Sequence, residues 1–338
     1  MDTISYVSLS VFYGLTIIIG CVLNFVILIR IMSKKSFRIK HANLFLVSLC
    51  LSDMFTCAYS ITYHLVHLHP AIYSSYLSTT YCRVTQYFVY ALAFVSTLSL
   101  TAVCIERYLA ITKPFFYASS KMATLCYIML LLPWIHSFVT SIPVLVLPVV
   151  SITNYTGFPC GFVSTWEAQQ IYMVLVPMNI LLPFICIVFS CIAVFNVARK
   201  QLHSIKALTP SALNQTTKEA MAESHTSDSV DIVRLKTNAE RDRANRKNVT
   251  KRFDKGNFRE ETRIAFATLA VAIGVLFAWM PYLVTRLLYL IGIELDDSLH
   301  LFGTAFTLAN SAWNPILLLA VRKDLRKSVL SLFRKSQI

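Results

Sequence analysis

Long apolar runs, each bounded by charged or turn-forming residues, dominate the sequence. A helix that spans a bilayer needs about 20 mostly apolar residues, because its backbone amides must be satisfied without water. Seven stretches meet that requirement: residues 8–30, 41–66, 82–108, 122–147, 170–197, 262–290 and 299–321. Beyond them, an apolar residue recurs every four positions from Val321 to Phe333 among basic neighbours. The pattern predicts an all-α membrane protein, a seven-helix bundle with a short amphipathic eighth helix.

Basic residues collect on one side of these spans. Of the 31 Lys and Arg residues, all but Arg83 and Arg286 fall in the expected inner loops and the C-terminal segment. Since Lys and Arg favour the cytoplasmic side, this asymmetry predicts an N-terminus outside and a C-terminus inside. The net charge of +14 is then a topology signal and an attraction to inner-leaflet lipid, and it does not indicate nucleic-acid binding.

One membrane domain accounts for most of the chain. We expect residues 1–7 to form a short extracellular N-terminus, 8–321 the transmembrane domain, and 322–338 the amphipathic helix and tail. Residues 200–258, in the third inner loop, are polar and lack an apolar period, so we expect them to be largely disordered. The absence of internal repeats leaves a transporter or channel as a weakly supported alternative.

Two features fall on the expected outer side. Of the nine cysteines, only Cys82 and Cys160 lie there, so a single disulfide between them is the economical inference. Asn154 begins an Asn-Tyr-Thr glycosylation acceptor in the same outer loop. The matches at Asn214 and Asn248 fall on the cytosolic side, where they should stay unmodified.

Polar residues also occur at membrane depth, where they are costly unless they face protein or a hydrated cavity. Asp53 is the only acid deep within a span, and Ser96, Asn310 and Asn314 fall at comparable depth. A carboxylate among neutral oxygen donors could hold a sodium ion. A structural hydrogen-bond network around a protonated Asp53 is the alternative.

Each span carries a short motif. In chain order these are Gly20-Cys21-Val22-Leu23-Asn24, Leu49-Cys50-Leu51-Ser52-Asp53, Glu106-Arg107-Tyr108, Trp134, Pro183, Trp279-Met280-Pro281 and Asn314-Pro315. With these motifs the chain resembles the rhodopsin-like (class A) G-protein-coupled receptors over nearly its whole length. The resemblance implies a multi-pass plasma-membrane receptor, not an enzyme, that binds an extracellular ligand and activates heterotrimeric G proteins. It also implies arrestin and receptor kinases as further partners.

The resemblance places a switch at the inner end of the third helix. In this family the arginine of the motif is held by its neighbouring acid and by an acid on the sixth helix, and opening of the sixth helix releases it towards a G protein. The positions that match this switch are Glu106, Arg107, Tyr108, Pro114, Phe115 and Glu261.

Two positions depart from the family pattern. Leu318 stands where the Asn-Pro-x-x-Tyr motif has its tyrosine, and Cys191 replaces the tyrosine expected on the fifth helix. In the family these two hydroxyls meet through water in the active state. A decoy or scaffold receptor of the same fold, which does not signal, is therefore the alternative function.

The sequence says more about which ligands are excluded than about which ligand binds. No lysine lies between Lys255 and Lys323, so the seventh helix cannot form a retinal Schiff base and the protein is not a functioning opsin. Val89 stands where amine receptors carry an aspartate, which disfavours an amine. The short outer N-terminus favours a small molecule or short peptide, and no cofactor beyond sodium is expected. The predicted ligand pocket comprises Gln86, Val89, Tyr90, Asn179, Trp279, Tyr282, Arg286 and Thr304.

Arg286 is the predicted cation of this pocket. A guanidinium there suits a carboxylate, a phosphate or a peptide terminus. An equally supported interpretation pairs Arg286 with acidic residues of the outer loops, namely Glu167, Glu294 or Asp296.

Overall fold

The computed structural model describes residues 3–33, 41–68, 78–148, 150–152, 160–162, 166–197, 199–200, 266, 269–285, 287–288, 291, 293 and 297–335. The longest helices are α1 (Thr3–Ser33), α3 (His41–Leu68), α5 (Thr79–Thr112), α7 (Ser120–Thr140) and α12 (Asp297–Val321). The shorter ones are α6 (Pro114–Tyr117), α8 (Ile142–Val146), α9 (Trp166–Val176) and α13 (Lys323–Lys335). α9 continues through η1 (Pro177–Leu181) into helical residues 182–197, which form the fifth long helix with it, and Leu269–Thr285 form the sixth.

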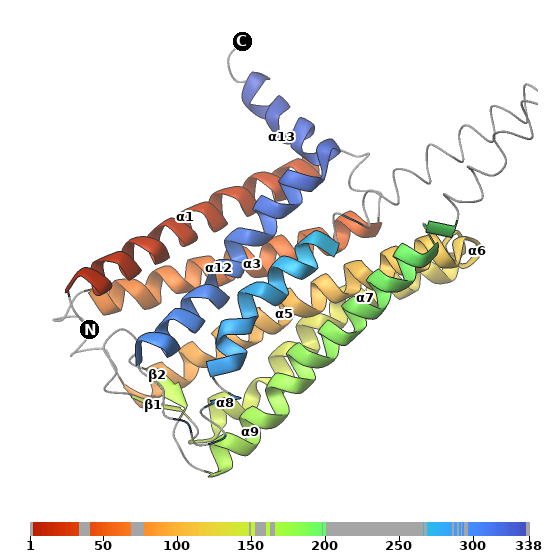
Figure 1. The fold of residues 1–338 in the computed structure, drawn as a ribbon. Coiled ribbons are helices and arrows are strands. Elements are labelled where there is room, and N and C mark those ends of the chain that lie inside the picture. The colour runs from red at the N-terminus through yellow and green to blue at the C-terminus, as the bar shows by residue number, and fades with distance from the viewer. Residues whose placement is uncertain are drawn as a thin grey trace, which may run out of the picture.

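These helices form one bundle (Figure 1). Five described stretches are long and apolar enough to cross a membrane, and Leu269–Thr285 and Ala305–Val321 are shorter apolar helices. Large apolar side chains such as Ile18, Ile185 and Phe277 remain exposed on the outside of the bundle. Such a surface is expected where helices face acyl chains instead of water.

The bundle has two distinct ends (Figure 1). The N-terminus lies near a small antiparallel hairpin of β1 (Val150–Ile152) and β2 (Cys160–Phe162), paired in the register Ile152 to Cys160. α6 and α13 lie at the opposite end, where α13 packs against α1 and α12. We call these the hairpin end and the α13 end. The sequence did not predict the hairpin.

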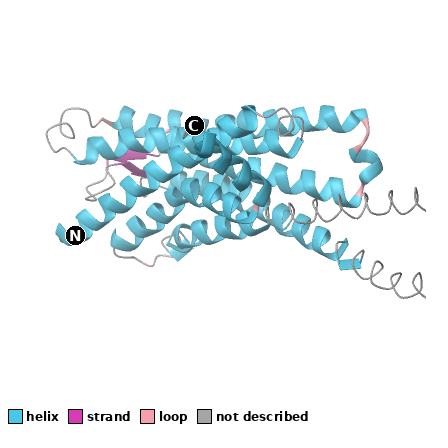
Figure 2. Cartoon of the chain, turned by 90° about the horizontal axis from the view of Figure 1, so that it is seen from above, coloured by secondary structure: helices cyan, strands magenta, loops and turns pink. Residues whose placement is uncertain are grey.

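α5 lies at the centre of the bundle, packed against α3 and α7, and Figure 2 shows the helices gathered around one another. Phe94, Val95 and Leu100 on this helix are almost fully buried. The helix begins after Ser78, whose hydroxyl accepts a hydrogen bond from the backbone N–H of Tyr81 at 3.1 Å. It ends at Lys113 because the following Pro114 disfavours helical geometry in the preceding residue and opens α6 instead.

Glycine permits a close approach where α1, α3 and α12 meet. A Cβ on Gly20 would lie 2.6 Å from Sγ of Cys57 and 3.3 Å from the backbone oxygen of Ser311. These contacts leave no room for a side chain. The amide of Asn24, one turn later, donates at 2.9 Å to the same Ser311 oxygen. The first family motif therefore serves helix packing as well as polar bonding.

Two predicted spans are interrupted. Ser141 separates α7 from α8, so the span expected over residues 122–147 is not one continuous helix. Pro143 falls in the first turn of α8, where its missing N–H costs no helical hydrogen bond. Pro177 opens the π-helical turn η1, which buries Asn179. Such turns follow local hydrogen bonding, which the hydropathy pattern does not report.

Candidate functional site

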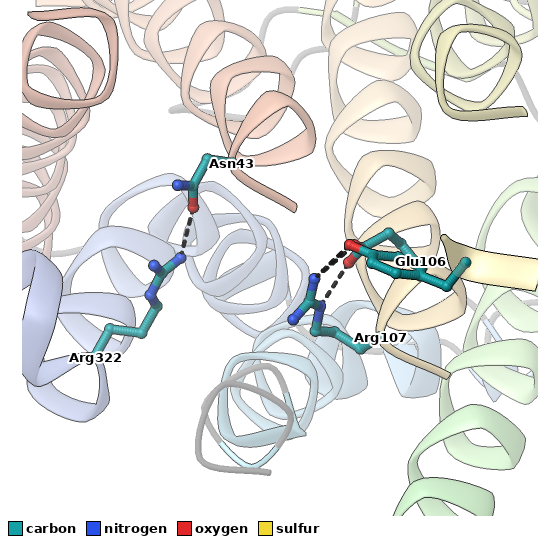
Figure 3. A network of polar contacts seen from close by, with 5 residues as sticks. Asn43, Glu106, Arg107 and Arg322 are labelled. Carbon is teal, nitrogen blue, oxygen red and sulfur yellow. Dashed lines mark hydrogen bonds and ion pairs between the residues drawn. The ribbon is translucent and has the colours of Figure 1, made fainter. Parts of the chain in front are cut away.

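The site is built around a buried ion pair at the last turns of α5. Nε of Arg107 donates to Oε2 of Glu106 and Nη2 donates to Oε1, both at 2.5 Å (Figure 3). Glu106 is 0% exposed and Arg107 4% exposed. Two parallel bonds between a guanidinium and a carboxylate fix both position and orientation. The structure thus brings together two of the predicted switch residues.

Tyr117 completes this network, and sequence reasoning missed it. Its hydroxyl donates to Oε1 of Glu106 at 2.5 Å and accepts from Nη2 of Arg107 at 3.3 Å. Tyr117 is the last residue of α6, and a helix of four residues has no apolar period that a sequence pattern could reveal. The only signal was Pro114, which marks the start of a new helical turn near the motif.

A cavity opens beside the ion pair. It is lined by Cys104, Arg107, Ser190, Cys191, Val194, Phe195, Phe266 and Leu269. Arg107 therefore lies at the junction of α5 with the fifth and sixth long helices. This small space of about 10 Å³ places the guanidinium next to apolar side chains.

The other switch residues have different surroundings. Phe115 is 94% exposed and next to Pro114 at the start of α6, which leaves an apolar side chain free for a partner. The ring of Tyr108 is half-buried and lies 6.2 Å from the ring of Phe189. Glu261 lies outside the described residues, so its pairing with Arg107 stays a prediction.

Asp53 is the centre of a second polar cluster. Its carboxylate is fully buried and accepts hydrogen bonds from Ser96 at 3.0 Å, Asn314 at 2.9 Å and Ser311 at 3.5 Å. The donors come from α5 and α12, so this cluster joins three helices. Ser96 and Asn314 were predicted for this site.

Two amide oxygens on α12, one of them on Asn314 of this cluster, have no hydrogen-bond partner among the described residues. They are Oδ1 of Asn310 and Oδ1 of Asn314, both buried. A buried carbonyl-type oxygen without a donor costs free energy unless something else satisfies it. Carboxylate, hydroxyl and amide oxygens are ligands that hard cations accept, so these residues fit a sodium ion.

Three residues of the predicted ligand pocket contact one another. The hydroxyls of Tyr90 and Tyr282 share a hydrogen bond of 2.7 Å that links α5 to the sixth long helix. The indole of Trp279 packs edge-on against Tyr282 with ring centroids 6.0 Å apart. Its buried N–H has no partner in the part of the chain that is described. These three aromatic residues form one cluster.

Asn179 is turned towards another set of residues. Its amide donates to the Leu175 carbonyl at 2.9 Å and accepts from the Thr140 hydroxyl at 3.4 Å. Gln86 and Val89 are half-buried on α5. Arg286 lies outside the described residues, and so does the side chain of Thr304. Membership of these residues in a ligand pocket stays a prediction.

The outer features are described only in part. Cys82 is disulfide-bonded, and β2, which begins at Cys160, packs against α5. The other seven cysteines within helices are free. The pairing of Cys82 with Cys160 stays a prediction, and Asn154 lies outside the described residues.

Polar bonds attach α13 to the bundle, and the sequence analysis missed these too. Nη1 of Arg322 donates to Oδ1 of Asn43 at 2.9 Å, and both residues are buried (Figure 3). Nη2 of Arg322 donates to Asp324 at 2.7 Å. On α1, Nε of Arg30 donates to Ser328 at 2.5 Å. Arginines counted as topology signals therefore also make specific contacts.

Comparison with known proteins agrees with this architecture. The chain matches the family model described as "7 transmembrane receptor (rhodopsin family)" over residues 23–318. It superposes on squid rhodopsin with a TM-score of 0.72 at 19% identity, covering 99% of this chain and 87% of that one. At this identity the superposition shows the fold alone.

Curated relatives match the chain over segments of different length. The cholecystokinin receptor type A of Cavia porcellus is 26% identical over 163 residues, 47% of this chain and 37% of that protein. The human neuromedin-K receptor is 31% identical over 135 residues, 40% of this chain and 28% of that protein. The D(5)-like dopamine receptor of Takifugu rubripes is 24% identical over 330 residues, 94% of this chain and 63% of that protein. The alignments thus span less than two thirds of each relative.

Proposed function

Because the chain belongs to the rhodopsin family of seven-transmembrane receptors, we propose that it responds to an extracellular ligand at the plasma membrane by activating heterotrimeric G proteins. One observation carries the proposal. Arg107 is buried, bonded twice to Glu106 and once to Tyr117, and lines a cavity at the α13 end. We take that end to face the cytosol, as the basic residues predict.

The energetics of this ion pair suit a switch. A buried ion pair adds little net stability because desolvation offsets the attraction. Separating the pair, however, leaves each buried charge without its partner. A helix movement that opens the cavity would separate Arg107 from Glu106 and present the guanidinium to an incoming protein segment. Phe115, exposed at the same end, supplies an apolar contact for that partner. Arrestin and receptor kinases are proposed as further partners of the same end.

Sodium is the proposed allosteric ligand. Asp53 supplies the charge, Ser96 a hydroxyl, and Asn310 and Asn314 amide oxygens without described partners. An ion in this cluster would tie α3 and α5 to α12 and so favour one arrangement of the three helices.

The proposed ligand is a small molecule or short peptide. The relatives include receptors named for cholecystokinin and neuromedin-K, which supports a peptide. The dopamine receptor relative raises the amine alternative, but Val89 offers no charge to an ammonium group. Trp279 offers a buried N–H donor below Tyr282. The lack of lysine in the seventh helix supports a ligand other than retinal.

A second candidate function is a decoy or scaffold that does not signal. It rests on Cys191 and Leu318, where the family tyrosines are missing. Leu318 is buried in the core, and Cys191 lines the cavity beside Arg107. Neither residue can supply the hydroxyl that would bridge helices through water.

The experiment that separates the two candidates is a cell assay of G-protein dissociation across the main subtypes. Cells express the chain or Arg107→Ala at equal surface level, and receive pooled short peptides and anionic metabolites. A signal that Arg107→Ala abolishes supports the receptor. Silence in the wild type together with activity in the double variant Cys191→Tyr, Leu318→Tyr supports the decoy.

A further inference from the structure

Two thiols meet in the cavity beside Arg107. Cys104 lies on α5 nearly one turn before Arg107, and Cys191 lies on the fifth long helix. Their side chains lie within interaction range of each other across the two helices. Both residues line the cavity together with Arg107. Neither thiol has a part in the ion-pair network or in the Asp53 cluster.

The two thiols differ in access. Cys104 is buried, whereas Cys191 is only partly buried, so Cys191 is the more exposed of the two thiols that line the cavity. Thiols that line one small cavity from two neighbouring helices need little movement to form a disulfide, whose geometry requires closely placed side chains. Reactivity with oxidants depends on such access and on the thiolate form.

We propose that Cys104 and Cys191 form a peroxide-sensitive site, at which oxidation ties α5 to the fifth long helix beside Arg107. The cytosolic placement of this site and its effect on signalling rest on the proposed function. Formation of the bond itself does not.

The chemistry balances with hydrogen peroxide as the oxidant. The Cys191 thiolate attacks one peroxide oxygen, the O–O bond breaks, and the products are a sulfenic acid and, after protonation, water. The thiol of Cys104 then attacks the sulfenic sulfur, the S–O bond breaks, and a second water leaves as the S–S bond forms. In total two thiols lose two electrons and two protons, and one peroxide becomes two waters. Cytosolic thiols reverse the reaction by exchange.

The disulfide would affect the ion pair by holding two helices in place. It would join two of the helices that line the cavity and prevent their separation next to Arg107. The ion pair with Glu106 would then be retained in the closed arrangement. The expected effect is a loss of G-protein activation that a reductant restores.

The chain contains a matched comparison pair. Cys21 on α1 and Cys57 on α3 also lie within interaction range of each other. Neither lines the cavity beside Arg107. If access through that cavity controls oxidation, this second pair should remain reduced under the same treatment.

The test uses membranes that contain the full chain. They are treated with hydrogen peroxide, blocked with N-ethylmaleimide, and digested for mass spectrometry without reduction. We expect a peptide pair linked through Cys104 and Cys191 that dithiothreitol separates, and unlinked, alkylated Cys21 and Cys57. Cys104→Ser and Cys191→Ser must each abolish the link. In parallel, G-protein activation is measured before and after peroxide and again after dithiothreitol.

The outcomes are distinct. Alkylated Cys104 and Cys191 after peroxide, or irreversible oxidation of Cys191 without a link, overturn the site. Equal linking of Cys21 with Cys57 overturns the role of the cavity. A link that leaves G-protein activation unchanged overturns the regulatory effect alone. A receptor that is silent before treatment refutes the proposed function, while the linked peptide still supports the thiol site.

Discussion

Tyr117 is a part of the ion-pair network that the sequence did not predict. Glu106 bonds the guanidinium of Arg107 twice. The Tyr117 hydroxyl bonds both members of the pair and thereby connects α6 to the end of α5. A partner that displaced α6 would therefore loosen the hold on Arg107 directly.

Tyr117→Phe should raise basal G-protein activation. The change removes a hydrogen bond to a carboxylate, and even about 1 kcal/mol lost from the closed state shifts the equilibrium roughly fivefold. Basal nucleotide exchange at equal surface level is the measurement. Tyr127→Phe, an exposed position on α7, is the matched control and should behave as wild type. Basal activity at or below wild type in Tyr117→Phe would contradict this role.

Asp53→Asn should remove the response of the protein to sodium. An ion at ten times its dissociation constant stabilises the folded state by about 1.4 kcal/mol, which raises the melting temperature. The purified receptor is melted in sodium chloride and in choline chloride at equal ionic strength. We expect the wild type to melt at a higher temperature in sodium chloride than in choline chloride. For Asp53→Asn we expect the same melting temperature in both salts. An equal sodium effect in both proteins would exclude Asp53 as the ligand and support a structural network.

At the level of helices, the attachment of α13 depends on two arginines from different elements. Arg322 joins the start of α13 to Asn43 on α3, and Arg30 joins α1 to Ser328. Burial favours a raised pKa for Asp324, but the hydrogen bonds and charge of Arg322 outweigh it and hold the pKa below its ordinary value. The carboxylate therefore stays ionised at neutral pH and stabilises Arg322 there. That contribution is lost only as the pH falls through the lowered pKa.

Arg322→Ala should destabilise the α13 end. It leaves the buried Oδ1 of Asn43 without this donor, at a cost of about 1 to 3 kcal/mol. Thermal unfolding in detergent should show a lower melting temperature. Lys323→Ala removes the next, exposed, positive charge and should change it little. Equal effects of the two variants would mean that net charge, and not the bond to Asn43, stabilises this end.

Helix positions could be predicted well from the sequence. α3 begins at His41 and α12 ends at Val321, as the hydropathy pattern predicted. Acyl chains tolerate few polar groups, so composition alone marks the spans. Ser141 and Pro177 show the limit, because the helix break and the π turn there depend on backbone bonding that leaves no mark in composition.

The candidate site was predicted in part. Glu106, Arg107 and Asp53 were found because charged residues are rare at the positions they hold. Tyr117 and Asn43 could not be found in this way, since their roles arise from side-chain contacts between different helices. An ordinary tyrosine or asparagine near a helix end gives no such signal.

For the molecule as a whole, the proposed function depends on which end faces the cytosol. The basic residues predict that the hairpin end is outside. Asn154→Gln should then abolish a glycosidase-sensitive mobility shift of the full-length protein, because that end passes through the secretory lumen. Asn214→Gln and Asn248→Gln should leave the shift intact. A shift that depends on either of these two residues instead would reverse the topology.

The most direct test of the receptor proposal is nucleotide exchange in a purified system. The wild type, Arg107→Ala and Tyr117→Phe are reconstituted in vesicles at equal density with each of the main purified heterotrimers. We predict exchange above empty vesicles for the wild type with at least one heterotrimer, faster exchange for Tyr117→Phe, and the empty-vesicle rate for Arg107→Ala. Exchange at the empty-vesicle rate for all three proteins with every heterotrimer, or full activity of Arg107→Ala, would contradict the proposal that Arg107 couples this chain to a G protein.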